Sequence, residues 1–162
     1  MPKINLTQGL KEEYERLFNP CRISEQRTGA VDAIVKEILK NRAAYEAVAL
    51  DLRIPWHFIS VIHNMESGLN FSRHLHNGDP LNARTVHNPD GRPKTGSPPF
   101  TWETSAKDAL MMKGLNAEKD WSISGLLYQI EGYNGWGYRL YHTHVLSPYL
   151  WSYSNYYTAV ST

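Results

Sequence analysis

The stretch from Gly68 to Pro99 constrains the fold of this 162-residue chain more than any other feature. It is rich in Asn, Gly, Pro, His and Arg, and it contains the turn sequences NGDP, NPDGRP and GSPP. A structureless loop of this length is uncommon in a compact domain, and such a loop is usually functional or contains short strands. We therefore predict a small, irregular β-hairpin here, formed by ARTVH and the residues after NPDG.

Helical patterns lie on both sides of this insert. Thr7 and Ser24 can each cap a helix before it, and Thr101 and Ser122 can cap two helices after it. Pro55 is placed to begin a further helix, because proline is favoured at the first helical position. Residues at helical spacing form a core-facing stripe in that helix: Phe58, Val61, Ile62, Met65 and Leu69. The chain is thus predicted to be mainly α-helical.

Length and composition predict one globular unit. With 41% hydrophobic residues, a chain of this size can bury a single core. We expect one domain over 1–162, with a helical part at about 1–67, the insert at about 68–100 and an aromatic-rich helical part at about 101–162. The net charge of +1 gives no field that would attract nucleic acid, and no apolar run is long enough for membrane insertion. We expect a monomer.

The N-terminal residues and the single cysteine bear on where the protein is made. The sequence MPKINLTQGLKEEYERLF becomes charged where a secretory signal needs an apolar core. Cys21 is alone, which excludes an internal disulfide and fits synthesis in a reducing compartment. We expect synthesis in the cytoplasm without a signal peptide, with release by a holin or a secretion machine, or else a domain cut from a longer protein.

Glu66, in the sequence MESGLNF, is the leading candidate for a catalytic residue. At helical spacing it lies on the flank of the apolar stripe, near the end of its helix. Partial burial raises the pKa of a carboxyl group, which suits an acid that must stay protonated near neutral pH. The alternative is a cap or an ion pair, for example with Arg73. A carboxylate near a helix C-terminus opposes the helix dipole, however, so stability alone gives little reason for it.

Aromatic residues gather in the C-terminal part. Most of the 10 tyrosines follow residue 127, together with Trp121, Trp136 and Trp151. Flat rings with a polar edge can cover the C–H face of a pyranose while their hydroxyl groups bind its rim. The alternative is that these rings fill the core of a small helical domain. For the cluster as a whole we favour some contact with a sugar ligand.

Two motifs resemble those of the lysozyme-like superfamily. MESGLNF resembles the Glu-Ser motif in which a helix delivers a catalytic glutamate, and EGYNGWGYR is similar to the Tyr-Asn-Ala-Gly stretch of lytic transglycosylases and goose-type lysozymes. The family's intervening Gly-Leu-Met-Gln motif is not recognisable here. The resemblance implies a mainly α, α+β lysozyme-like fold with a substrate cleft, and Glu66 as general acid on peptidoglycan glycan strands. It implies that Tyr133 and Asn134 line the cleft. The candidate substrate-binding residues also include Ser67, His63 and Trp136.

A second carboxylate would distinguish two mechanisms. Asp79 and Asp90 follow Glu66 in the order and spacing of the loop aspartates of goose-type lysozymes. If either holds a water molecule, the reaction is inverting hydrolysis, a muramidase activity. Both also lie in ordinary turns, where aspartate bonds to its own backbone. If neither acts, the substrate's own groups complete the reaction, and a lytic transglycosylase gives 1,6-anhydro products.

Two hypotheses from other classes remain open. A zinc-dependent cell-wall peptidase could use His63, His74, His76 and His87, although HExxH and a cysteine pair are absent. A non-catalytic glycan-binding module would keep the aromatic residues but would leave Glu66 without a purpose. We favour the glycosidase, and for it we expect neither a metal nor a cofactor.

Overall fold

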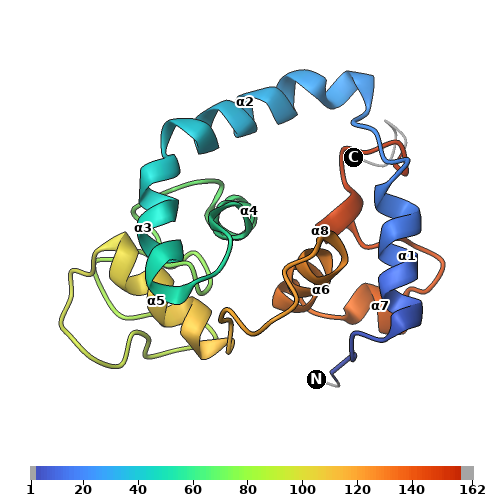
Figure 1. The fold of residues 1–162 in the computed structure, drawn as a ribbon. Helices are drawn as coiled ribbons and strands as arrows, with labels where there is room; N and C mark the ends of the chain where they lie inside the picture. The colour runs from blue at the N-terminus through green and yellow to red at the C-terminus, as the bar shows by residue number, and fades with distance from the viewer. Residues whose placement is uncertain (1–2, 158–162) are drawn as a thin grey trace. The chain divides into compact units, whose positions relative to one another are not determined.

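The protein is mainly α-helical in the computed structural model, which describes residues 3–157. The helices in chain order are α1 (Gln8–Phe18), a 3-10 turn η1 (Glu25–Arg27), α2 (Thr28–Lys40), α3 (Arg42–Leu52), α4 (Trp56–Ser67), α5 (Trp102–Met112), α6 (Ile123–Asn134), α7 (Gly137–Tyr141) and α8 (Pro148–Trp151) (Figure 1). The described residues form no sheet, and the predicted mainly α class is confirmed. None of the helices in this part of the chain combines the length and the apolar character that crossing a bilayer requires.

The chain divides into two compact units. The terminal unit combines Met1–Lys36 with Asp120–Thr162, and the central unit is Glu37–Lys119. The two ends of the chain therefore share one unit, and the insert at 68–100 lies wholly within the other. This division differs from the three consecutive parts expected from the sequence, and the single domain over 1–162 stays a prediction.

In the terminal unit, α1 packs against α6, and α6 also contacts α8 (Figure 1). The hydroxyl group of Thr7 accepts a hydrogen bond from the Leu10 amide at 3.2 Å, and that of Ser122 accepts one from the Gly125 amide at 3.3 Å. These caps confirm the predicted starts of α1 and α6. Aromatic rings dominate the buried core of this unit, which consists of Leu10, Tyr14, Leu127, Tyr128, Trp136 and Trp151.

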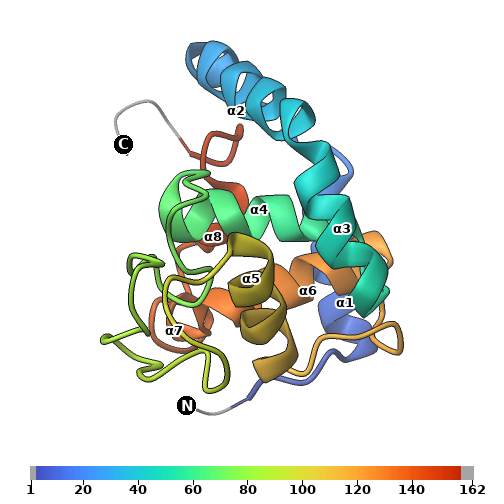
Figure 2. The ribbon, with the colours of Figure 1, turned by 90° about the vertical axis from the view of Figure 1, so that its left-hand side faces the viewer.

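In the central unit, α3 packs against both α4 and α5 (Figure 2). The hydroxyl group of Thr101 caps α5 by accepting from the Thr104 amide at 3.1 Å, as predicted. Helix α4 begins at Trp56, directly after Pro55, which agrees with the predicted start within the usual uncertainty of a helix boundary. The fully buried side chains of this unit include Tyr45, Val48, Phe58, Ile59, Ile62, Leu75 and Leu110.

The predicted capping role of Ser24 is wrong. The long helix that follows it begins only at Thr28, after the short turn η1. The Ser24 hydroxyl group instead donates to the carbonyl of Ser154 at 2.9 Å. The Ser24 side chain therefore binds a residue that lies 130 positions away in the sequence and does not cap the helix that follows it.

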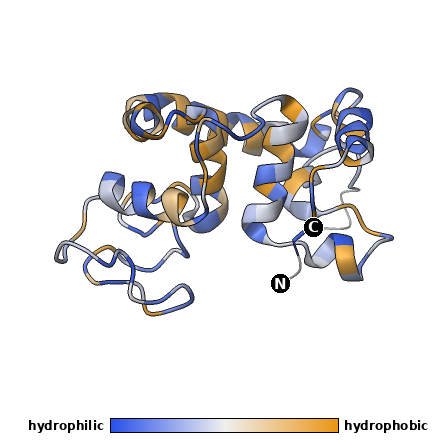
Figure 3. Ribbon diagram, turned by 60° about the horizontal axis from the view of Figure 1, so that its bottom comes forward, coloured by the Kyte–Doolittle hydropathy of each residue, from blue (hydrophilic) through white to orange (hydrophobic). Residues whose placement is uncertain are grey.

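The predicted β-hairpin in the insert is also wrong. The insert forms one isolated bridge, between Arg73 and Pro80, and the rest of it is irregular and mostly hydrophilic (Figure 3). Thr85 and Arg92 make one hydrogen bond of a strand pair, from the Thr85 amide to the Arg92 carbonyl at 2.8 Å. The returning Arg92 amide donates to the Thr85 hydroxyl group at 2.9 Å instead of to its carbonyl. The prolines of the insert lack the amide N–H that a ladder needs. Many backbone hydrogen-bonding groups of the insert are therefore bonded to side chains.

A polar network attaches the insert to α5. His74 Nδ1 lies 2.7 Å from the Ser105 hydroxyl oxygen, and His76 Nε2 lies 2.6 Å from Asp108 Oδ2. Arg92 binds the same carboxylate, with Nη2 at 2.8 Å from Oδ1 and Nε at 3.1 Å from Oδ2. Burial lowers the pKa of His76, although its hydrogen bond with Asp108 opposes this effect. These contacts take the place of a strand ladder in fixing the insert.

Candidate active site

Glu66 lies in the last turn of α4, as the sequence predicts. The helix ends at Ser67, and Gly68 follows in the left-handed conformation at φ 62°, its amide bonded to the carbonyls of Asn64 and His63. The ends of helices carry unpaired carbonyl groups, which repel a negative charge. This position therefore disfavours the ionised form of the Glu66 side chain.

The electrostatic surroundings of Glu66 favour its protonated form. The side chain is half-buried, and its carboxyl group makes no hydrogen bond or ion pair with another residue of the described part of the chain. Burial raises the pKa of Glu66 to about 7, against the opposing effect of Lys113. Burial has this effect because it removes the water that stabilises the charged form. Near neutral pH, Glu66 can thus hold a proton and donate it.

The turn of the insert that contains Gly78 packs on the end of α4. A Cβ atom on Gly78 would lie 2.8 Å from the backbone oxygen of Glu66, and the φ of this residue is +85°. Only glycine fits both the contact and the conformation. Arg73 supports the turn by donating from Nη1 to the Gly78 carbonyl at 3.0 Å. Asp79 follows directly, so the turn brings it close to the Glu66 backbone.

The two aspartates of the insert lie in different environments. Asp79 is 8% exposed, and its carboxylate accepts hydrogen bonds from the Val86 amide at 2.9 Å, the His87 amide at 3.0 Å and His87 Nδ1 at 2.7 Å. Burial works to raise the pKa of Asp79, but these hydrogen bonds outweigh it and lower the pKa to about 2. Asp90 is exposed. Asp79 is therefore an ionised group that is already engaged, and its role as base stays a prediction, as does that of Asp90.

His63 and Ser67, both predicted to contact substrate, make structural contacts. His63 is fully buried, with Nδ1 2.8 Å from the Tyr45 hydroxyl oxygen and its ring 4.5 Å from that of Phe71. Burial lowers the pKa of His63. The Ser67 hydroxyl group lies 3.3 Å from the carbonyls of His63 and Asn70 and closes the end of α4. Contact between His63 and a substrate would require the core to open.

Tyr133, Asn134 and Trp136 belong to the terminal unit, at the end of α6 and just after it. Asn134 donates from Nδ2 to the Ile130 carbonyl at 3.0 Å. Trp136 is 6% exposed and packs on Tyr128 with 5.2 Å between ring centroids, which fits the core alternative for this ring. Their contact with a sugar bound at Glu66, in the central unit, stays a prediction.

Glu131 is a buried glutamate that the sequence did not single out. Glu131 is 1% exposed, accepts a hydrogen bond from the Tyr14 hydroxyl group at 2.6 Å, and binds Arg139 Nη2 at 3.0 Å. Arg139 in turn binds Glu13, with Nη2 2.6 Å from Oε2. The charged groups join α1, α6 and α7. The signal in the sequence was EGYNGWGYR, which contains both Glu131 and Arg139, but its partner Tyr14 lies 117 positions away.

The histidines do not assemble into a metal site. His74 is held by Ser105 at Nδ1 and by the Ala83 carbonyl at Nε2, each at 2.7 Å, so both of its ring nitrogens are occupied. His76 Nε2 is bound to Asp108. Between residues 3 and 157, no group of three or more His, Cys, Asp or Glu side chains is arranged to hold a metal ion. The zinc peptidase hypothesis therefore gains no support from these contacts.

Comparisons with protein-family models, with curated proteins and with solved structures gave no match to this chain. A function must therefore follow from the residues and their geometry.

Proposed function

We propose that this protein is a lysozyme-like glycoside hydrolase that cleaves the β-1,4 bond between N-acetylmuramic acid and N-acetylglucosamine in bacterial peptidoglycan. Glu66 acts as the general acid and donates its proton to the leaving glycosidic oxygen. A residue of the insert at 68–100, in the same unit as Glu66, activates the attacking water molecule.

One observation carries this proposal: Glu66 is half-buried at a helix end, and burial raises its pKa to about 7. A general acid is most effective when its pKa lies near the working pH. Lysozymes obtain their proton donor by the same means, a carboxyl group in apolar surroundings. The sequence resemblance of MESGLNF to the Glu-Ser motif points to the same residue.

A lytic transglycosylase is the second candidate, and the state of Asp79 is the observation in its favour. Both carboxylate oxygens of Asp79 already accept hydrogen bonds within the insert. If no residue activates water, the substrate's acetamido and hydroxyl groups complete the reaction after Glu66 has protonated the leaving oxygen. The product then ends in a 1,6-anhydro sugar in place of an ordinary reducing end.

Digestion of purified peptidoglycan, followed by mass spectrometry of the released fragments, tests the proposal. The wild-type protein should release glycan fragments, and Glu66→Gln should reduce the rate about 10²–10⁴-fold, the usual contribution of a general acid or base. Glu118→Gln is the matched control, because Glu118 is an exposed glutamate of the same unit, and it should keep full activity. Wild-type rates in a folded Glu66→Gln protein would refute the assignment. The mass of the new chain ends distinguishes hydrolysis from transglycosylation.

A further inference from the structure

The turn that packs on Glu66 also holds His87. Gly78 rests against the Glu66 backbone oxygen, where a Cβ atom would lie at 2.8 Å. The residues on either side of Gly78 both bind His87: Asn77 Nδ2 donates to its carbonyl at 3.0 Å, and Asp79 Oδ1 lies 2.7 Å from its Nδ1. Three consecutive residues, Asn77, Gly78 and Asp79, thus connect His87 to the helix end that carries Glu66, and Asp79 is the one that contacts the imidazole.

Asp79 is poorly suited to activate water itself. Its Oδ2 accepts the amides of Val86 at 2.9 Å and His87 at 3.0 Å, and its Oδ1 binds the His87 ring. The residue is only 8% exposed. A base must present a free lone pair to the proton that it removes, within about 2.6–3.2 Å or through one water molecule. The exposed side chain that binds Asp79 directly, and that has a ring nitrogen able to accept a proton, is His87.

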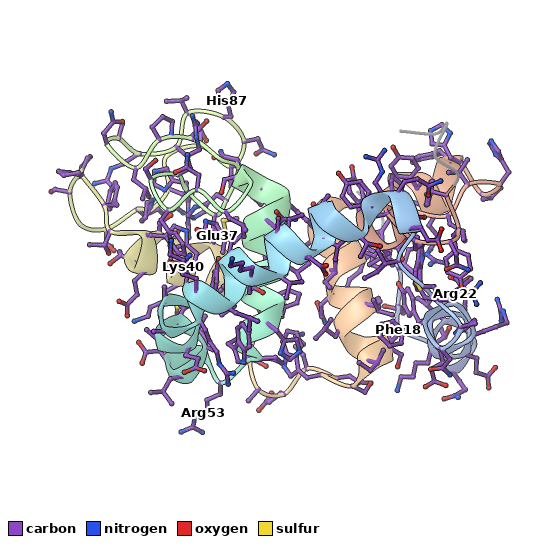
Figure 4. The ribbon with its side chains drawn as sticks, turned by 90° about the horizontal axis from the view of Figure 1, so that it is seen from above. Phe18, Arg22, Glu37, Lys40, Arg53 and His87 are labelled. Atoms are coloured by element: carbon purple, nitrogen blue, oxygen red, sulfur yellow. The ribbon has the colours of Figure 1, made fainter. Side chains whose placement is uncertain are left out.

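The contact with Asp79 fixes the proton arrangement of His87. Hydrogen bonds hold the pKa of Asp79 at about 2 despite its burial, so its carboxylate is ionised and can only accept. His87 Nδ1 must therefore carry the hydrogen, and in the neutral ring the lone pair then lies on Nε2. The His87 side chain is 78% exposed, and Figure 4 shows it at the outer edge of the insert. A buried carboxylate that orients an exposed imidazole is the arrangement of a general base and its orienting partner.

We propose that His87 is the general base of glycan hydrolysis and that Asp79 is its positioning residue. This assignment depends on the proposed function, because it supplies the partner that Glu66 needs. The oxygen of a water molecule bonds to the anomeric carbon as the bond from that carbon to the glycosidic oxygen breaks. Glu66 gives its proton to the departing oxygen, and one proton of the water passes to His87 Nε2. The imidazolium so formed is paired with the Asp79 carboxylate, and solvent later returns the proton to Glu66.

Steady-state cleavage of soluble, uncrosslinked glycan strands provides the test. His87→Ala should lower kcat by about 10²–10⁴-fold with little change in KM, and added imidazole should restore at least about tenfold of the lost rate, since the ring is exposed and its site is open. His57→Ala is the matched control, because His57 is another exposed histidine of the central unit, on the first turn of α4. It should keep wild-type kcat and show no response to imidazole.

Two further variants separate a chemical role from a structural one. His87→Gln keeps a donor for Asp79 but has no basic nitrogen, so it should fold normally, remain slow and resist rescue by imidazole. Asp79→Asn should change the ¹⁵N NMR signals of the His87 ring from one tautomer, with hydrogen on Nδ1, to a mixture. Its kcat should fall in parallel. Thermal unfolding of each variant reports any loss of fold.

The outcomes distinguish this assignment from the proposed function. If Glu66→Gln is inactive while His87→Ala keeps wild-type kcat, His87 is not the base. Loss of activity through KM alone, or without rescue by imidazole, also overturns the assignment, because it indicates a binding role. Products with 1,6-anhydro ends require no water and overturn it while leaving Glu66 in place. If Glu66→Gln is itself fully active, the proposed glycosidase function fails as well.

Discussion

Glu66→Gln should stabilise the protein above neutral pH even though it removes the proposed acid. Glutamine keeps the shape of the side chain but cannot ionise. In the wild-type protein, burial disfavours the charged form of Glu66 and raises its pKa to about 7. The unfolded chain ionises this group at its ordinary pKa of 4.5. The folded protein must therefore either keep Glu66 protonated or hold its negative charge in a partly buried position.

The size and sign of the effect follow from linkage between protonation and folding. A carboxyl pKa of about 7 in place of 4.5 corresponds to about 3 kcal/mol, because each pH unit is worth about 1.4 kcal/mol. Since the folded state binds the proton more tightly, the contribution of Glu66 to stability is complete below pH 4.5 and is lost as the pH rises through about 7. Partial exposure of the side chain makes this figure an upper bound.

Urea unfolding at pH 4 and at pH 8.5 measures the effect. The difference in unfolding free energy between Glu66→Gln and wild type should shift in favour of the variant by as much as about 3 kcal/mol between the two pH values. Glu118→Gln, at an exposed position, should show no such shift. If the difference in unfolding free energy between Glu66→Gln and wild type is the same at both pH values, burial does not raise the pKa of Glu66. The main support for its role as an acid then fails.

Three further outcomes follow from the packing. Gly78→Ala should destabilise the protein by at least about 1–2 kcal/mol in urea unfolding, because alanine is disfavoured at its φ of +85° and its Cβ would overlap the backbone oxygen of Glu66. Gly29→Ala, with open space around its Cβ position, is the control. Arg139→Met should cost about 3–5 kcal/mol in the same assay, because it leaves the buried Glu131 without its cation. Activity on peptidoglycan should survive EDTA, and loss with EDTA that zinc reverses would favour the peptidase hypothesis.

The helices could be predicted from the sequence because their signals are local. Thr7, Thr101 and Ser122 each accept a hydrogen bond from an amide three residues later, which is a contact that the residue type alone makes probable. The apolar spacing of α4 likewise placed Glu66 beside buried residues at the end of the helix, and its raised pKa agrees with that position. The sequence pattern was sufficient to predict features that depend only on residues within one helical turn of each other.

The insert and the buried charges depend on distant partners, which a single sequence does not reveal. Whether Asp79 serves as a base or a structural acceptor depends on Val86 and His87, which reach it only after the chain has reversed direction. The turn sequences predicted where the chain bends but not which amides the bends would bring to a carboxylate. Glu131 is a further case, because its partner Tyr14 comes from the opposite end of the chain.

Glu131 and Glu66 differ in how the surroundings satisfy their carboxyl groups. Glu131 is almost completely enclosed, yet Tyr14 and Arg139 satisfy its carboxylate, so its burial is consistent with stability alone. Glu66 lies at a helix end that repels its charge, and no other side chain between residues 3 and 157 bonds to its carboxyl group. Glutamine would keep the shape of this side chain without the cost of a partly buried charge above neutral pH. Function is expected at positions that break local rules, and Glu66, a carboxyl group at the C-terminal end of a helix, is such a position.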